Sequence, residues 1–239
     1  MTLPELRQYM QELTQGTVYA GKTYIVGGAV RDYLLGIVPI TDYDLCVALP
    51  GGGIKLGGLI LETCKDATLC RVNKRFGTIG LKLCDISLDL AATRRERYTE
   101  GSRYPRVRYG SLLEDVYRRD FTINALMMSL DNAELLDLCK MGLDDLKQGV
   151  IRTLREPQLV LKEDPLRIMR AVRFATRFDF SFSDDLTLAL RECSALVKSI
   201  SGKRQAQELK LLKADGNLAK ALELYSTLGI QQYLKPGEA

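Results

Sequence analysis

The feature that most constrains the fold is a change in hydrophobic periodicity near Ser111. Before it, short alternating segments separated by Gly-rich turns predict strands interleaved with helices. After it, apolar residues recur at helical spacing and almost no strand signal remains. The sequence therefore predicts a mixed α/β half followed by an all-helical half, with a boundary near residues 131–151.

Individual elements follow from the same patterns. In the first half we expect helices at 2–15 and 29–36, and strands at 23–26, 43–48, 68–72, 77–84 and 86–91. In the second half we expect helices at 111–118, 122–130, 142–148, 157–177, 183–199, 202–214 and 217–228. Residues 50–67 are Gly-rich and then helical in pattern, without a functional explanation in the sequence. Residues 94–110 are polar and basic, which predicts a mobile loop.

The chain of 239 residues contains no histidine, which restricts its chemistry. Ser-His-Asp catalysis, a histidine general base and metal sites built on imidazole are excluded. The six cysteines include no C-x-x-C pair, which excludes zinc ribbons and thioredoxin-like motifs. Cys46 and Cys84 lie in apolar segments, so we expect reduced, structural thiols. No apolar run approaches the roughly 20 residues of a membrane span and no signal peptide is evident, so we expect a cytoplasmic protein without membrane contact.

Positive charge gathers before the change in periodicity. Between Arg71 and Arg108 lie ten Lys or Arg residues and four acidic ones, although the whole chain has a net charge of only +4. Tyr98, Tyr104 and Tyr109 are interleaved with these cations, as in surfaces that stack bases and contact phosphates. A solvated basic loop is the alternative explanation, and charge alone does not decide between the two.

Carboxylates supply the candidate chemistry. Asp42 and Asp44 lie two residues apart at the start of an expected strand, so their side chains point to the same face. Such a pair favours a bridging hard cation such as Mg²⁺ together with substrate phosphates, although one D-x-D is expected by chance in this chain. Asp89, between leucines in another expected strand, is a third candidate.

A glycine pair precedes these carboxylates. Gly27 and Gly28 end an expected strand and begin a helix that contains Arg31. Exposed backbone N–H groups, a helix N-terminus and a guanidinium together suit a triphosphate. A Walker A motif is absent, so the combination favours metal-dependent phosphoryl or nucleotidyl transfer outside the P-loop class.

Further motifs follow in one order along the chain. They are residues 27–36 with 41–45, residues 75–78 with 89–94, residues 118–126, and residues 163–174. They resemble the signatures of the class II tRNA nucleotidyltransferases, which are the CCA-adding enzymes and bacterial poly(A) polymerases of the DNA polymerase beta superfamily. The resemblance implies an α+β fold, with a mixed nucleotidyltransferase sheet flanked by helices at residues 1–140 and an all-helical, base-recognising neck at 141–239.

The resemblance also implies roles for individual residues. Asp42 and Asp44 would hold two Mg²⁺ ions, and Asp89 would help to activate the primer 3′-hydroxyl. The triphosphate and sugar of the nucleotide would be contacted by Gly27, Gly28, Arg31, Arg119, Asp120 and Asn124. The loop at 94–110 would correspond to the family's flexible loop, which is coupled to base selection.

The last motif would read the incoming base. The resemblance implies that Asp164 and Arg167 bind its Watson–Crick edge. The spacing is compatible with this role, since on the expected helix the two lie one turn apart and place an acceptor beside a rigid donor fork. A surface ion pair without function explains the same spacing. Arg170, Arg173 and Arg177 continue the stripe, either toward nucleotide phosphates or as an exposed face opposite the apolar one.

The expected function is template-independent transfer from CTP or ATP to the 3′ end of tRNA. Poly(A) addition to other RNA 3′ ends shares these motifs, and a non-catalytic RNA- or nucleotide-binding module is the alternative outside the enzymes. Members of the family commonly continue into body and tail regions, whereas this chain stops where the neck is expected to end. The chain is then a fragment, a natural minimal enzyme, or a protein whose tail is supplied by a partner. In each case we expect reduced tRNA affinity, because remote phosphate contacts are lost.

Overall fold

The computed structural model describes residues 1–97 and 105–235, which form two compact units. Within these residues, unit 1 contains 1–97, 105–119 and 123–142, and unit 2 contains 120–122 and 143–235. None of the described helices has the length and apolar character needed to cross a bilayer.

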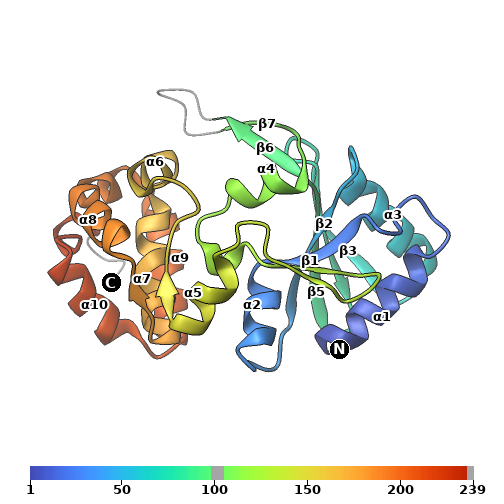
Figure 1. The fold of residues 1–239 in the computed structure, drawn as a ribbon, viewed down its shortest axis with the longest axis horizontal. Helices are drawn as coiled ribbons and strands as arrows, with labels where there is room; N and C mark the ends of the chain where they lie inside the picture. Colours follow the sequence, from blue (N-terminus) through green and yellow to red (C-terminus); the bar gives the residue numbers. More distant parts are fainter. Residues whose placement is uncertain (98–104, 236–239) are drawn as a thin grey trace. The chain divides into compact units, whose positions relative to one another are not determined.

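Unit 1 is built around a seven-stranded mixed sheet (Figure 1). Its strands are β1 (Thr23–Val26), β2 (Asp42–Val47), β3 (Ala67–Asn73), β4 (Thr78–Leu83), β5 (Ile86–Ala92), β8 (Met127–Ser129) and β9 (Leu135–Leu136). Their spatial order is β3-β4-β5-β2-β1-β8-β9. Neighbours are antiparallel except β2 and β5, which run parallel.

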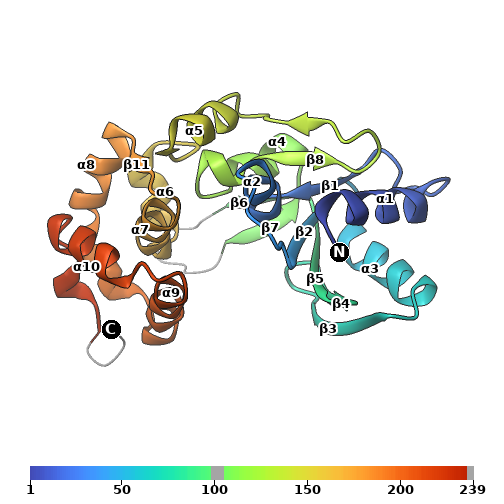
Figure 2. The ribbon, with the colours of Figure 1, turned by 90° about the horizontal axis from the view of Figure 1, so that it is seen from below.

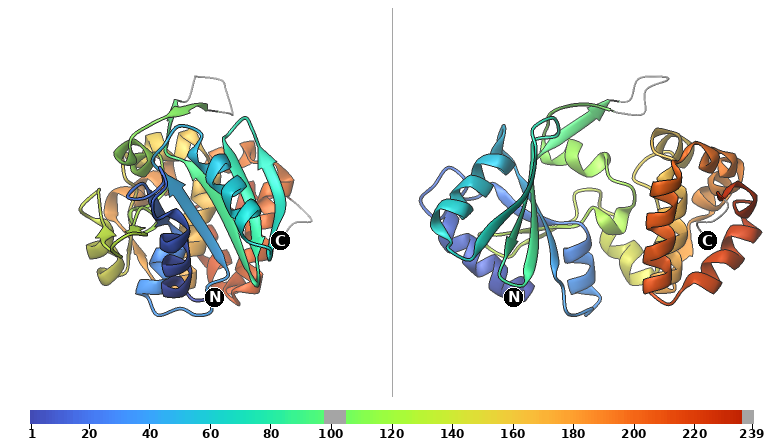
Figure 3. Two further views of the ribbon diagram at one scale, coloured as in Figure 1. Left: turned by 90° about the vertical axis from the view of Figure 1, so that its right-hand side faces the viewer. Right: turned by 180° about the vertical axis from the view of Figure 1, so that it is seen from behind.

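Helices cover both faces of this sheet. They are α1 (Leu3–Thr14), α2 (Gly28–Leu34), α3 (Gly52–Thr63) and α4 (Leu112–Tyr117). A further helix, α5 (Gly142–Gln148), begins at the last residue of unit 1 and otherwise belongs to unit 2. α1 and α3 lie against one face and α2 on the other (Figures 1 and 3). α1 begins at the expected capping box, in which the Glu5 N–H donates to the Thr2 hydroxyl and the Thr2 N–H donates to the Glu5 carboxylate.

The glycines of residues 50–67 allow α3 to approach the sheet closely. A Cβ atom on Gly53 would lie 2.6 Å from the Cα of Ala91 in β5, and one on Gly57 would lie 2.5 Å from the Ile79 side chain in β4. Only hydrogen fits at such distances, so these residues set the spacing between helix and sheet. The Gly-rich segment thus has a structural explanation that its sequence did not reveal.

Residues 94–110 are not a loop throughout, and that expectation was wrong. β6 (Arg94–Arg97) and β7 (Arg106–Tyr109) form an antiparallel ribbon, with Arg95 opposite Arg108. Both strands are short and carry few apolar side chains, so they lack the alternation by which a strand is recognised. Tyr98 and Tyr104 lie outside the described residues.

The helix expected at 122–130 was also wrong. Thr122–Asn124 form a 3₁₀ turn (η1), and Met127–Ser129 form β8, which pairs with β1. Every residue from 121 to 130 is buried, so no amphipathic period distinguishes strand from helix here. Pairing with β1 then decides the conformation.

Unit 2 is mainly helical (Figure 2). Its elements are α6 (Pro157–Glu163), α7 (Leu166–Phe178), α8 (Asp184–Glu192), α9 (Gly202–Ala214), α10 (Leu218–Thr227) and the 3₁₀ turns η2 (Ser194–Ser199) and η3 (Gln231–Tyr233). α7 packs against α6, α9 and α10. A short parallel pair, β10 (Val150–Ile151) with β11 (Ser181–Phe182), departs from the expected all-helical pattern.

Two of the long helices expected in this unit are interrupted. Asp164 separates α6 from α7 with an extended backbone (φ −142°, ψ 98°), because Pro165 disfavours the helical conformation at the preceding residue. The helix expected at 183–199 ends at Glu192 and continues as η2.

The cysteines are all free, as expected. Cys46 is buried in β2 and fits the structural role predicted for it. Cys84 is exposed instead, because it lies in the turn between β4 and β5 with a positive φ of 52°.

Candidate active site

Three carboxylates share one face of the sheet in unit 1. Tyr43 and Leu45 of β2 are buried, so the alternation of the strand points Asp42 and Asp44 to the opposite, exposed face. β5 runs beside β2 with Asp89 directly opposite Asp44. Directly opposed residues on paired strands point to the same face, so two neighbouring strands place the three predicted acids on one face of the sheet.

Asp44 lies among like charges. Its pKa is raised above the ordinary value of 3.8, first by desolvation and then by the Asp89 and Asp42 carboxylates, while the Arg119 guanidinium acts in the opposite direction. A cation would relieve this repulsion, and carboxylate oxygens are the ligands that hard divalent ions prefer. The donor set therefore fits a divalent metal held by Asp42 and Asp44.

Asp89 does not complete a ready-made metal site. Among the described residues, no three acidic or thiol groups are gathered closely enough to hold an ion. The Asp89 carboxylate instead accepts a hydrogen bond from the Arg71 guanidinium of β3.

A cavity of about 280 Å³ adjoins these residues. Its charged lining consists of Asp44, Asp89, Arg71, Arg94, Arg118 and Arg119. Four guanidiniums against two carboxylates leave an excess of positive charge, which suits a polyphosphate.

Gly27 lies beside Asp44 and Arg119. It has a positive φ of 72° at the start of α2, and a Cβ atom there would lie 3.2 Å from Nη1 of Arg119 and 3.8 Å from Oδ2 of Asp44. Glycine both adopts this conformation without strain and keeps the space between the two charged groups open. The neighbouring Gly28 adjoins Arg31, whose Nη2 atom would lie 3.4 Å from a Cβ on Gly28.

Arg31 is buried and holds Asn124. Its guanidinium donates to Oδ1 of Asp32, with Nε and Nη2 at 2.8 and 2.6 Å, and Nη1 donates to Oδ1 of Asn124. The backbone carbonyl of Asn124 accepts from Nη1 of Arg119 at 3.4 Å. Arg31 is thus linked within unit 1 to Asn124 and, through it, to Arg119, two predicted nucleotide-binding residues that are distant from Arg31 in sequence.

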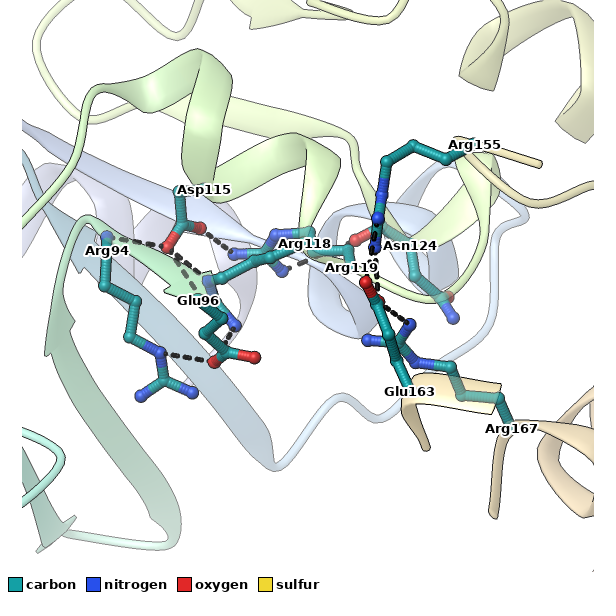
Figure 4. Close-up of polar contacts among 9 residues, drawn as sticks. All are labelled: Arg94, Glu96, Asp115, Arg118, Arg119, Asn124, Arg155, Glu163 and Arg167. Atoms are coloured by element: carbon teal, nitrogen blue, oxygen red, sulfur yellow. Dashed lines mark hydrogen bonds and ion pairs between the residues drawn. The ribbon is translucent and has the colours of Figure 1, made fainter. Parts of the chain in front are cut away.

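Asp115 organises the two arginines of the third motif. It is fully buried in α4, where Oδ1 accepts from Arg118 at 2.8 Å and Oδ2 accepts from Arg119 at 2.9 Å (Figure 4). Burial alone would raise the pKa of Asp115, but the Arg119 and Arg118 guanidiniums outweigh it and the pKa is lowered. Glu96 of β6 adds ion pairs to Arg94 and Arg118, at 3.0 and 3.5 Å.

Sequence reasoning missed Asp115, Glu96 and Arg94. The spacing could have revealed Asp115, because it lies three and four residues before Arg118 and Arg119 in an expected helix. Glu96 and Arg94 reach the site only because residues 94–97 form a strand, which the sequence did not indicate.

The remaining predicted residues belong to unit 2. Asp120 accepts hydrogen bonds from Arg170, with Nε at 2.8 Å and Nη2 at 2.7 Å from Oδ2. The Asp120 carboxylate is the main reason that the pKa of Arg170 is raised. Asp164 accepts from Nη2 of Arg204 through both carboxylate oxygens, at 3.1 and 3.0 Å.

Arg167 is buried in the first turn of α7. Its Nη1 donates to the Val160 carbonyl at 3.2 Å and lies 3.4 Å from the Glu163 carboxylate, which Arg155 also contacts (Figure 4). Because Asp164 ends α6, it does not share one helix with Arg167, and the expected geometry was wrong in this respect.

The stripe that continues from Arg167 is not uniformly exposed. Arg173 is buried and pairs with Glu208 of α9 at 2.7 Å, so it lies neither on an exposed face nor free for a phosphate. The ion pair joins α7 to α9 inside unit 2.

Comparison with known proteins identifies the family. Residues 23–152, more than half of the chain, match the model of the poly A polymerase head domain. The chain belongs to this family. The predicted resemblance is therefore confirmed, and enzymes of this nucleotidyltransferase family depend on divalent metal ions.

Curated relatives of this head-domain protein are tRNA nucleotidyltransferases. An A-adding tRNA nucleotidyltransferase of Aquifex aeolicus is 38% identical over 209 residues, which cover 85% of this chain and 24% of the relative. A CCA-adding enzyme of Geobacillus thermodenitrificans is 33% identical over 241 residues, which cover 99% of this chain and 56% of the relative. The chain thus spans about a quarter of the first relative and just over half of the second.

Solved structures of the family share the fold. The CCA-adding enzyme of Bacillus stearothermophilus in complex with CTP matches 100% of this chain and 55% of its own, with 29% identity and a TM-score of 0.79. A Thermotoga maritima CCA-adding enzyme complexed with tRNA matches 98% of this chain and 52% of its own, with 29% identity and a TM-score of 0.76. These matches confirm the expected α+β fold class.

Proposed function

We propose that this chain transfers nucleotidyl groups from CTP or ATP to the 3′ end of tRNA without a nucleic-acid template. The proposal rests mainly on the pairing of β2 with β5, which places Asp42, Asp44 and Asp89 on one face beside a cationic cavity. The A-adding and CCA-adding relatives support the choice of nucleotide and acceptor. In this proposal residues 1–140 act as the catalytic head and 141–239 as the base-recognising neck of a cytoplasmic enzyme.

The reaction is an in-line substitution at phosphorus. The 3′-oxygen of the primer forms a bond to the α-phosphorus, the bond from that phosphorus to the bridging oxygen breaks, and pyrophosphate leaves while the hydroxyl proton passes to solvent. Mg²⁺ held by Asp42 and Asp44 would stabilise charge on the phosphates and ease deprotonation of the hydroxyl, so that no histidine is needed. Asp89 orients the attacking hydroxyl.

The cationic residues bind the triphosphate. Arg119 presents its guanidinium beside Gly27 and Asp44, in an orientation fixed by Asp115, and its buried Nε–H has no partner among the described residues. Such a preorganised donor needs little rearrangement when a phosphate binds. Arg31 and Asn124 support this position from α2 and η1 and contact the sugar–phosphate end of the nucleotide together with Gly28. Asp120 of unit 2 is likewise proposed as a nucleotide-binding residue.

Base choice belongs to unit 2 in this proposal. Asp164 and Arg167 offer an acceptor and a donor fork for the Watson–Crick edge, and Arg170 assists in nucleotide binding. Their present partners, Arg204, Glu163 and Asp120, hold these side chains in defined orientations.

Poly(A) addition to other RNA 3′ ends is the second candidate, since the family model is described by that activity.

The test uses three tRNA substrates that end before CCA, after the first C, and after CC. Each is incubated with Mg²⁺ and labelled CTP or ATP, with a second series in excess chelator. Addition that stops at one CCA, or at the terminal A, supports tRNA nucleotidyltransfer, whereas long A tails support poly(A) addition.

The carboxylate variant completes the test. Asp42→Ala should abolish incorporation, and Asp66→Ala, which removes an exposed carboxylate elsewhere in unit 1, should retain it. Equal incorporation by the wild type and Asp42→Ala, or none by the wild type on any RNA, would reject both enzyme functions and leave the binding module.

A further inference from the structure

One row of residues crosses four strands of the sheet. Arg71 of β3 is opposite Gly80 of β4, Gly80 is opposite Asp89 of β5, and Asp89 is opposite Asp44 of β2. The register of β3 shifts between Leu69 and Arg71, which brings Arg71 into this row. An arginine and two acids are therefore aligned by backbone pairing.

Gly80 makes it possible for the outer two members to meet. A Cβ atom on Gly80 would lie 2.8 Å from Oδ1 of Asp89 and 2.8 Å from Cγ of Arg71. The two side chains thus occupy the space above Gly80 that any larger residue would fill. Arg71 reaches across β4 and donates to Asp89 there.

This contact draws Asp89 toward β4. Since β4 and β2 flank β5 on opposite sides, a carboxylate that lies over Gly80 leans away from Asp44. The absence of a three-ligand metal group among the described residues agrees with this position. Two forces act in the same direction, because Asp44 repels Asp89 and Arg71 attracts it.

We propose that Arg71 is a positioning residue that acts as an internal counter-ion for Asp89 and thereby withholds the charge of that carboxylate from the metal site formed by Asp42 and Asp44. The inference rests on the proposed function, since it takes Asp42 and Asp44 as the metal-binding pair. The Arg71 and Asp89 side chains are 69% and 42% exposed, so their ion pair is of the weak, readily exchanged kind. A cation held by Asp42 and Asp44 would attract the Asp89 carboxylate away from Arg71, and both side chains line the same cavity.

Binding of Mn²⁺ to the full chain without nucleotide tests this directly, by calorimetry or by loss of the free-ion electron paramagnetic resonance signal. Removing the counter-ion in Arg71→Gln should tighten binding about two- to fivefold, the factor that corresponds to a weak exposed ion pair. Arg71→Lys, which keeps the charge, should remain close to the wild type. The Mg²⁺ concentration for half-maximal transfer should fall in parallel for Arg71→Gln.

Lys82→Gln is the matched control. Lys82 lies on the same face of β4 but is opposite Ser87 rather than Asp89, so its loss changes the charge without freeing the carboxylate. Equal tightening by Lys82→Gln and Arg71→Gln would show a general charge effect and overturn the inference. Unchanged or weaker binding by Arg71→Gln would also overturn it.

A second variant tests the same contact from the glycine side. Gly80→Ala should separate Arg71 from Asp89 and tighten Mn²⁺ binding as Arg71→Gln does. If it fails to fold, Arg71→Gln alone decides, because that side chain is exposed and its loss does not threaten the core.

The Asp44→Asn variant distinguishes failure of the proposed metal site from failure of the Arg71 inference. The wild type should bind Mn²⁺ and Asp44→Asn should not. If Asp44→Asn binds as well as the wild type, the metal site and this inference both fall. If Asp44→Asn loses Mn²⁺ binding but Arg71→Gln binds like the wild type, the proposed function is retained and the counter-ion role of Arg71 is rejected.

Discussion

At the scale of single residues, the geometry of the site depends on side chains that hold the binding groups rather than contact substrate themselves. Asp115 is the clearest case, because one buried carboxylate fixes the orientations of both Arg118 and Arg119. Arg31 holds Asn124 in the same way, in addition to its own proposed contact with the nucleotide. Substitutions at such residues should therefore affect stability and nucleotide binding together.

Asp115→Asn should show this dependence through pH. Because the pKa of Asp115 is lowered in the folded protein, its ionisation stabilises the fold fully above the ordinary value of 3.8 and ceases to do so as pH falls through the lowered pKa. At pH 7 we expect the variant to lose about 3–5 kcal/mol in free energy of unfolding, measured with urea. The difference from the wild type should shrink below pH 3.8; a difference that is the same at all pH values would contradict the assignment.

Arg167→Ala should relax base selection. The ratio of kcat/KM for CTP to that for ATP should move toward one, because the donor fork that reads the base is lost. Glu163 keeps Arg155 at 2.9 Å, so the loss of unfolding free energy should stay within about 3 kcal/mol. Arg177→Ala, at the other end of α7, should keep the wild-type ratio, and an unaltered ratio in Arg167→Ala would remove Arg167 from base recognition.

At the scale of elements, α3 shows how a helix that looks poorly formed in sequence is required by its packing. Its glycines lower helix propensity, yet three of them, Gly52, Gly53 and Gly57, lie where the sheet leaves room only for hydrogen. Contact with β4 and β5 therefore overrides local propensity.

Two alanine substitutions in α3 should have opposite effects. Gly53→Ala places a methyl group against the backbone of Ala91 and should destabilise the protein by about 1–3 kcal/mol. Gly58→Ala, where nothing lies within 4 Å, should stabilise it by up to about 1 kcal/mol through better helix propensity. Thermal and urea unfolding distinguish the two, and stabilisation by both would show that α3 is not in close contact with the sheet.

Sequence patterns predicted elements wherever one face is buried and the other exposed. β2 is such a strand, and its alternation also placed Asp42 and Asp44 correctly on one face. β8 was missed because it is buried on both sides, and β6 because its residues are almost all charged. Glu96 was overlooked for the same reason, since it lies in β6. Arg71 lies in a strand that the sequence did predict, but its place beside Asp89 depends on the pairing register of β3, β4 and β5.

The separation of Asp164 from Arg167 was in principle visible in sequence. Pro165 follows Asp164, and a residue before proline avoids the helical conformation. The helical pattern of residues 157–177 continues across Pro165 and therefore favoured one uninterrupted helix.

At the scale of the whole molecule, each unit has its own buried core and its own buried ion pairs. In unit 2 Arg173 and Glu208 form such a pair, with side chains only 8% and 6% exposed. A buried pair of this kind contributes little over apolar replacements, but removal of one partner leaves the other charged and unpaired.

Glu208→Ala should consequently destabilise unit 2 by about 3–5 kcal/mol. Hydrogen exchange followed by mass spectrometry should show faster exchange in α7, α9 and α10, with β2 and β5 unaffected. The double variant Arg173→Met with Glu208→Leu should recover most of the loss. Equal acceleration in β2 would contradict an effect confined to unit 2.

The parallel pairing of β2 and β5 has a consequence for tolerance to insertions. α3, β3 and β4 all lie between the two strands in sequence, yet the opposition of Asp44 and Asp89 depends only on the ladder that joins the strands. Connections can therefore lengthen or shorten at their turns while the two carboxylates keep their spacing. A slip of one residue in that ladder, by contrast, would turn Asp89 toward the core. Such a pairing error would therefore abolish catalytic activity and destabilise the fold together.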